Sequence, residues 1–269
     1  MQFLVDKSDI GNSIYSFKDK LKEYDFIQID NDELKNIYRE KNKDIILNML
    51  SINKPTIYFG SIQFNNILEK MMLPFSPGHY WYLDKMKFSY FSTYYENNLL
   101  LNNEYQISTF KEFINNTKEV CFFRPDVSTK TISGNIYNPN NNTDYNFYKD
   151  KIPLHDIVVK APLKNILEEY RLFIINKKLV TGSRYIKKNK IESKNISILD
   201  NYNEIYDFSL KAIECWEPDI CYTLDVCLLE DMSYKIVEVN SINSSGLYES
   251  DIETLIKHIS ECAYNDFIY

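Results

Sequence analysis

The chain has 269 residues, of which 31 are Lys or Arg and 38 are Asp or Glu, so its net charge is −7 with neutral histidine. This length suffices for one large domain or two small ones, and the negative charge argues against general binding to nucleic acid. The hydrophobic content of 44% excludes a disordered chain, and a glycine count of 6 excludes a collagen-like one.

The first 75 residues alternate short apolar runs with charged segments of helical spacing. The expected elements are a strand at 26–29, a helix at 31–50, a strand at 56–59 and a helix at 62–72. Gly60-Ser61 marks the turn between the second strand and the second helix. A strand, a Gly-Ser turn and a helix in succession indicate an α/β unit.

The middle of the chain places two cations around a polar loop. The expected elements are a short helix at 109–115, a strand at 120–123, a polar loop at 124–134 and a strand at 135–137. Arg124 ends the first of these strands and Lys130 lies in the loop, so the pair could neutralise a triphosphate. The loop lacks the GxxxxGK[ST] pattern of a P-loop, and two solvated surface cations are the alternative.

The C-terminal part is the most regular. The expected elements are strands at 157–159, 169–175, 179–182, 222–229 and 234–239, with helices at 203–216 and 250–262. Turns at 176–178 and 230–233 join two pairs of these strands as antiparallel hairpins.

Three oxygen-bearing side chains fall on the last hairpin. Glu238 and Asn240 point to the same face of one strand because the strand period is two residues, and Asp225 lies on the neighbouring strand. Carboxylate and amide oxygens suit Mg²⁺ held together with phosphate oxygens. The alternative is a hairpin with a polar, solvated face, although the flanking residues are apolar.

A second group of charges precedes that hairpin. Glu169 and Arg171 alternate on one strand and so share a face, and Arg184 follows the return strand. Such residues could bind a ligand or could form a surface of cross-strand ion pairs.

Cysteine usage and the termini bear on the compartment. The 5 cysteines include no CxxC pair, so a disulfide framework or a structural zinc site is not expected. No basic segment followed by an apolar run opens the chain, and no apolar run approaches the ~20 residues that span a bilayer. We therefore expect a cytoplasmic protein with reduced thiols and no membrane partner.

The order of these segments resembles the ATP-grasp fold, and most of all its divergent clade named for two arginines and one lysine. The resemblance covers roughly residues 55–255. The segments that carry it are Tyr58-Phe59-Gly60-Ser61-Ile62, Phe122-Phe123-Arg124-Pro125, Lys130-Thr131-Ile132-Ser133-Gly134, Glu169-Tyr170-Arg171, Val180-Thr181-Gly182-Ser183 with Tyr185, the set Asp225, Glu238 and Asn240, and Ser245-Gly246-Leu247-Tyr248.

The resemblance implies an α/β (α+β) fold in which two α+β subdomains clasp ATP after a small α/β pre-ATP-grasp domain. The implied bounds are 1–75 for the first domain, 76–155 for the N-terminal subdomain with a lid loop, and 156–269 for the C-terminal subdomain with the metal site.

The resemblance also implies roles for single residues. Arg124 and Lys130 would clamp phosphates, and the backbone of a hinge strand would bind adenine. The hinge strand is Ile157, Val158 and Val159, and Glu169 belongs to the same nucleotide-binding set. Arg171 and Arg184, with Lys130, would act in catalysis by orienting the carboxylate or the transferred phosphate. Asp225, Glu238 and Asn240 would hold Mg²⁺.

Members of this superfamily are similar in activating a carboxylate as an acyl phosphate, which an amine then attacks. The implied function is therefore an ATP- and Mg²⁺-dependent carboxylate-amine ligase acting on a small molecule, peptide or protein. Two alternatives stay open. One is an ATP-binding assembly factor for a protein partner, since the clade includes the cell-division-cycle assembly factor of a translation initiation factor. The other is a non-enzymatic adaptor.

Overall fold

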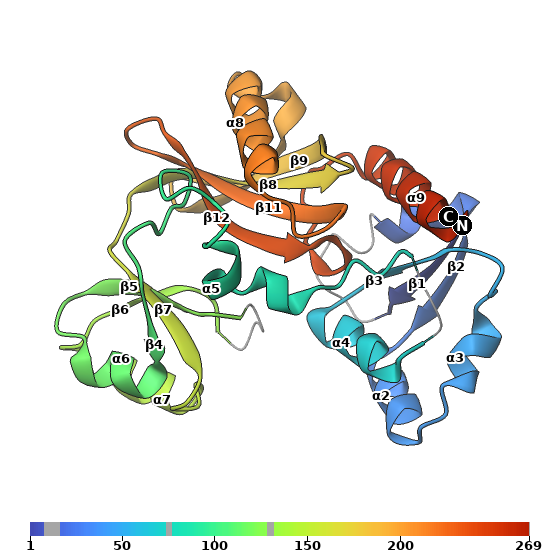
Figure 1. The fold of residues 1–269 in the computed structure, drawn as a ribbon, viewed down its shortest axis with the longest axis horizontal. Helices are drawn as coiled ribbons and strands as arrows, with labels where there is room; N and C mark the ends of the chain where they lie inside the picture. Colours follow the sequence, from blue (N-terminus) through green and yellow to red (C-terminus); the bar gives the residue numbers. More distant parts are fainter. Residues whose placement is uncertain (8–16, 74–76, 128–131, 269) are drawn as a thin grey trace.

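The computed structural model describes residues 1–7, 17–73, 77–127 and 132–268. These residues form three β-sheets with helices packed on them (Figure 1). Short 3-10 helices η1 (Leu21–Glu23), η2 (Leu83–Met86), η3 (Ile196–Ile198) and η4 (Ile242–Ser244) lie between the regular elements. The chain is therefore a mixed α/β protein, as the sequence predicted.

The first sheet is parallel and has the order β2-β1-β3. Its elements are β1 (Gln2–Asp6), β2 (Asp25–Ile29) and β3 (Thr56–Phe59), with helices α2 (Asn31–Arg39), α3 (Asp44–Met49) and α4 (Ile62–Met71). The single helix expected at 31–50 was wrong, because two helices occupy this stretch. The break lies at Lys41, whose φ of 55° is left-handed and ends a right-handed helix.

The Gly-Ser turn joins β3 to α4 as predicted. A Cβ on Gly60 would lie 2.5 Å from the Cβ of Asp6, so a larger residue does not fit there. Ser61 caps α4 by accepting a hydrogen bond from the backbone N–H of Phe64 at 3.1 Å. The buried Asp6 carboxylate accepts from both the N–H and the hydroxyl of Ser61, which fixes the start of the helix at the end of the sheet.

The second sheet has the order β4-β7-β5-β6 and is antiparallel. Its strands are β4 (Gln106–Thr109), β5 (Cys121–Pro125), β6 (Asn135–Tyr137) and β7 (Ile157–Ala161), and helices α6 (Phe110–Asn116) and α7 (Asn142–Lys149) accompany them. A cluster of aromatic side chains, including Phe113 and Phe123, forms its core. β7, which begins just after the boundary expected between residues 155 and 156, pairs with β4 and β5 inside this sheet.

The third sheet is antiparallel with the order β10-β9-β8-β11-β12. Its strands are β8 (Ile166–Ile175), β9 (Lys178–Lys187), β10 (Lys190–Asn195), β11 (Cys221–Leu229) and β12 (Tyr234–Ser241). Helices α5 (Phe88–Phe91), α8 (Tyr202–Cys215) and α9 (Ile252–Ile268) complete the chain. One core joins this sheet to α5 and α8, and another joins it to α9 and the first sheet.

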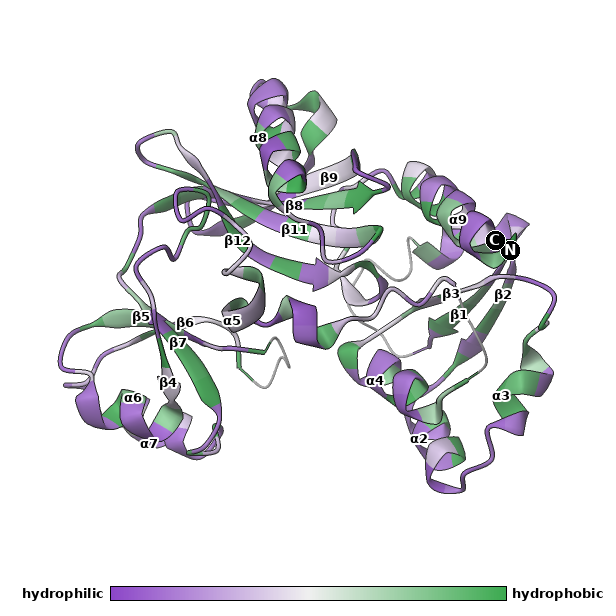
Figure 2. Cartoon of the chain, viewed as in Figure 1, coloured by the Kyte–Doolittle hydropathy of each residue, from purple (hydrophilic) through white to green (hydrophobic). Residues whose placement is uncertain are grey.

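Figure 2 shows polar and apolar residues alternating around α8 and α9, as expected for helices with one face on a sheet. Among the described helices, none combines the length and the apolar character that crossing a bilayer requires. The 5 cysteines are free thiols in this structure. Figure 1 shows the second sheet beside one edge of the third, so residues of β5 and β12 can meet.

Candidate active site

A cavity of about 330 Å³ lies where the second sheet meets the third. The second sheet contributes Phe122, Arg124 and Pro125 from β5, with Val127 and residues 132–134 from the segments beyond it. The third sheet contributes polar residues of β8, β9 and β12, namely Glu169, Arg171, Tyr185, Glu238 and Asn240. The cavity therefore brings together chemistry-bearing residues that lie far apart in the sequence.

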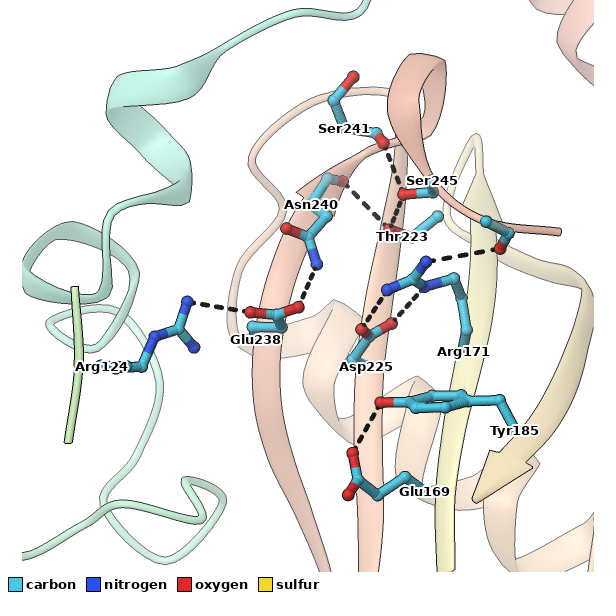
Figure 3. A network of polar contacts seen from close by, with 11 residues as sticks. Arg124, Glu169, Arg171, Tyr185, Thr223, Asp225, Glu238, Asn240, Ser241 and Ser245 are labelled. Atoms are coloured by element: carbon cyan, nitrogen blue, oxygen red, sulfur yellow. Dashed lines mark hydrogen bonds and ion pairs between the residues drawn. The ribbon is translucent and has the colours of Figure 1, made fainter. Parts of the chain in front are cut away.

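Arg124 and Glu238 join the two sheets across this cavity (Figure 3). A terminal nitrogen of Arg124 lies 2.9 Å from Oε2 of Glu238, and the Arg124 side chain is 8% exposed. Asn240 donates from Nδ2 to Oε1 of Glu238 at 2.8 Å. Burial raises the pKa of Glu238, but the Arg124 guanidinium and the Asn240 hydrogen bond outweigh it and lower that pKa, so the carboxylate stays ionised.

Asp225 and Arg171 form a second ion pair on the same face. Arg171 lies directly opposite Asp225 in the β8–β11 register, and Asp225 lies opposite Glu238 in the β11–β12 register. The Arg171 guanidinium donates twice to Asp225, from Nε at 2.8 Å and from Nη2 at 2.6 Å. The Arg171 side chain is 12% exposed and that of Asp225 is 1% exposed, so the bidentate geometry offsets only part of the cost of burying two charges.

Glu169 and Tyr185 complete the polar wall. The Tyr185 hydroxyl donates to Oε2 of Glu169 at 2.8 Å (Figure 3). Burial raises the pKa of Glu169, although the Tyr185 hydrogen bond opposes that rise. The Tyr185 ring stacks on Tyr248 with centroids 4.9 Å apart and planes at 11°.

The structure thus brings together most residues selected from the sequence. Arg124, Glu169, Arg171, Glu238 and Asn240 line the cavity, and Asp225 contacts Arg171 beside it. Lys130, expected to clamp phosphates, lies outside the described residues.

Arg184 is not part of this group. It is adjacent to Tyr185 on β9 and so points to the opposite face of the sheet. There it pairs with Glu168 at 3.2 Å and with Glu192, and its side chain is 5% exposed. The expectation that Arg184 orients a substrate is corrected, because its guanidinium is committed to ion pairs away from the cavity.

The hinge expected at Ile157, Val158 and Val159 is also corrected. These residues lie in β7, which is an inner strand paired with β4 on one side and β5 on the other. The sheet ladders therefore use the backbone groups that were expected to bind a base. The segment 162–165, between β7 and β8, is the connection that links the second sheet to the third.

Some lining residues escaped the sequence argument. Phe122 lies two residues before Arg124 on the same strand and therefore on the same face, so the alternation of the strand could have indicated Phe122 as a lining residue. Leu101 and Asn102 also line the cavity, and the chain reaches β12 at this point. The N–H of Leu101 donates to the Ile236 carbonyl at 2.9 Å. That pairing joins irregular chain to a strand far along the sequence, and no local pattern indicates it.

The donor set near Glu238 suits Mg²⁺. Glu238, Asn240 and Asp225 offer the hard carboxylate and amide oxygens that this cation prefers. Among the described residues, no group of three or more His, Cys, Asp or Glu side chains is arranged for a metal ion. Asn240 would therefore have to supply one of the ligands.

Comparison with known proteins adds a family. The model of an ATP-grasp domain family, the second family of the clade named for two arginines and one lysine, matches residues 101–258. No curated protein matches the chain. Among solved structures, the D-alanine–D-alanine ligase of Helicobacter pylori is 15% identical with a TM-score of 0.61, over 97% of this chain and 98% of that chain.

Two further structures are similar at lower identity. D-cycloserine synthetase DcsG is 8% identical with a TM-score of 0.63, over 99% of this chain and 100% of that chain. The ATP-grasp ligase PsnB, complexed with a minimal precursor, is 10% identical with a TM-score of 0.53, over 97% and 98% of the two chains. At these identities the likeness shows the fold alone.

Proposed function

The chain belongs to this second family of the two-arginine, one-lysine clade of ATP-grasp domains, and we propose that it is an ATP- and Mg²⁺-dependent ligase that joins a carboxylate to an amine. The family and the ATP-grasp fold expected from the sequence are thereby confirmed. The proposed acceptor and donor are a small molecule, a peptide or a protein.

The observation that carries this proposal is the ion pair between Arg124 and Glu238. It joins a cation from the second sheet to a carboxylate from the third across a cavity that both sheets line. A triphosphate with its cation fits such a site, because Arg124 can move from Glu238 to phosphate oxygens while Glu238 takes a metal ion. After that exchange the Arg124 guanidinium again faces negative oxygens, and the Glu238 carboxylate again faces a cation.

We assign the remaining roles by position. Glu238, Asn240 and Asp225 would hold Mg²⁺, which when bound neutralises charge on the phosphate oxygens. Apolar side chains in the cavity, Phe122 and Val237 among them, would enclose the adenine. The connection 162–165 would offer backbone groups to it in place of β7. Lys130 remains a proposed phosphate ligand on the resemblance alone.

In the proposed reaction, a carboxylate oxygen attacks the γ-phosphorus of ATP, and the bond between that phosphorus and the bridging oxygen of ADP breaks. The amine then attacks the acyl carbon, phosphate leaves, and the nitrogen loses a proton. Arg171 would orient the carboxylate or the transferred phosphoryl group from the cavity wall. The free thiols support a reducing, cytoplasmic setting for this chemistry.

Two measurements test the proposal. Isothermal titration calorimetry should show that ADP binds to the wild type with Mg²⁺ and binds weakly with EDTA. A screen of metabolites and peptides should then reveal an ATP-dependent mass gain equal to the amine minus one water. Binding of nucleotide to a protein partner complex, with no turnover in any pool, would favour an assembly factor instead.

The pH dependence of nucleotide binding follows from Asp225. Burial raises the pKa of this carboxyl to about 6, against the opposing effect of the Arg171 guanidinium. A carboxyl with a raised pKa is ionised only above that pKa, so affinity for Mg²⁺-nucleotide should fall as the pH drops from 7 to 5. We expect a loss of about tenfold per pH unit below 6 at most, measured by calorimetry. In Asp225→Asn the fall in affinity between pH 7 and pH 5 should be shallower than in the wild type, because only the titration of the nucleotide phosphate remains, and an unchanged profile would contradict the assignment.

A further inference from the structure

Tyr248 has an unusual backbone conformation. Its φ is 49°, in the left-handed region that a bulky aromatic residue rarely adopts. It occupies the second position of a turn in which the N–H of Ser250 donates to the carbonyl of Leu247 at 3.0 Å. The other described non-glycine residues with positive φ lie in hairpin turns or at helix ends: Lys41, Met72, Asn176, Lys177, Lys188, Asn189 and Met232. Tyr248 alone among them adjoins the candidate active site.

The fold holds this turn in place. Leu247 is fully buried, the N–H of Glu249 donates to the Ser183 hydroxyl at 3.3 Å, and the N–H of Asp251 donates to the Thr181 hydroxyl at 2.8 Å. Both hydroxyls belong to β9. A left-handed residue of this kind is strained and persists only where its surroundings determine it. These contacts hold the strained backbone of Tyr248 and thereby set the direction of its ring.

That ring lies against Arg171. The Arg171 guanidinium carbon is 5.5 Å from the Tyr248 centroid and 5.8 Å from the Tyr185 centroid, and the two rings are stacked on each other. Both distances are within cation–π range. Arg171 uses Nε and Nη2 on Asp225, whereas Nη1 is 3.5 Å from the Gly246 carbonyl, longer than an ordinary hydrogen bond. Nη1 carries two N–H groups, so the one that is not directed at the Gly246 carbonyl is left for a ligand.

We propose that Tyr248 is a positioning residue whose strained backbone holds its ring against Arg171, so that Nη1 presents its second N–H group to an oxyanion in the cavity. The oxyanion is the phosphoryl or carboxylate group of the reaction, so this inference rests on the proposed function. Tyr248 is absent from the described lining of the cavity, whereas Arg171 and Tyr185 belong to it. Tyr248 therefore acts through them.

The test compares three variants with the wild type. Tyr248→Asn keeps a residue that tolerates positive φ but removes the ring, and Tyr248→Phe keeps the ring. Met232→Asn makes the same change to Asn at an exposed left-handed position in the β11–β12 turn and serves as the control. Calorimetry uses inorganic phosphate as the oxyanion probe and MgADP, which lacks the γ-phosphoryl group, as the nucleotide probe.

We expect Tyr248→Asn to bind phosphate about tenfold more weakly, with MgADP affinity within about twofold and a thermal midpoint within about 3 °C of the wild type. Tyr248→Phe and Met232→Asn should match the wild type in all three measurements. If Tyr248→Asn unfolds early, Tyr248→Gly, which adopts the left-handed conformation freely, takes its place.

Wild-type phosphate affinity in Tyr248→Asn, or no phosphate binding by the wild type, would overturn the positioning role. If the wild type binds MgADP in either of these two cases, the ligase proposal is not affected. If Tyr248→Asn binds phosphate more weakly than the wild type does, and the wild type does not bind MgADP, the positioning role is supported and the ligase proposal is removed.

Discussion

Replacing Glu238 with Gln is expected to lower Mg²⁺-dependent turnover of ATP by about a hundredfold to a thousandfold. Glutamine keeps the shape of the side chain and one accepting oxygen but removes the negative charge that would hold the cation. It also leaves the buried Arg124 guanidinium without the carboxylate that lies 2.9 Å away. The measurement is ADP release under saturating ATP, with and without the acceptor pool that gives product.

The control for this variant is Glu214→Gln on the exposed side of α8, for which we expect wild-type turnover. Thermal unfolding of Glu238→Gln separates loss of the site from loss of the fold. A folded Glu238→Gln protein that turns over ATP at the wild-type rate and keeps its Mg²⁺ dependence would remove Glu238 from the metal site.

The strand pattern predicted much of the site because side chains two residues apart on a strand lie on the same face of the sheet. Glu238 and Asn240 alternate on β12. Asp225 on β11 falls opposite Glu238 because the register shifts by one residue between Asp225 and Val226; without that shift the hairpin would set Asp225 opposite Val237. Glu169 and Arg171 reach the cavity by the same alternation, one strand further along the sheet. Local alternation placed Glu238 with Asn240 and Glu169 with Arg171, whereas the irregularity that sets Asp225 opposite Glu238 leaves no signal in the local pattern.

The failures have a common physical cause. The parity that brings Tyr185 to the cavity sends Arg184 to the other face, and a charge alone does not reveal which face its strand buries. The resemblance implied a hinge that included Val159, but the neighbours of this residue in the sheet come from β4 and β5. Sheet order is a non-local property, and it decides whether a strand has free backbone groups.

The ion pairs of Arg184 lead to the second large expected effect, on stability. Arg184→Met should lower the free energy of unfolding by about 3 kcal/mol, because it leaves the largely buried carboxylate of Glu168 without its main partner. Lys187, at 3.7 Å from Glu168, compensates only in part because its side chain is 39% exposed. Urea denaturation gives the change, and calorimetry should show MgADP affinity within about twofold of the wild type.

Two companion variants make this prediction discriminating. Glu168→Gln in the Arg184→Met background should recover part of the lost stability, because it removes the stranded charge. Lys187→Met should cost no more than about 1 kcal/mol, as an exposed partner does. If Arg184→Met instead kept its stability and lost nucleotide affinity, Arg184 would have to reach the cavity in the nucleotide-bound protein, and the separation of the two faces of β9 would not hold. Retained affinity with lost stability assigns Arg184 to the scaffold that holds β8 and β9 in register, on which the positions of Glu169, Arg171 and Tyr185 depend.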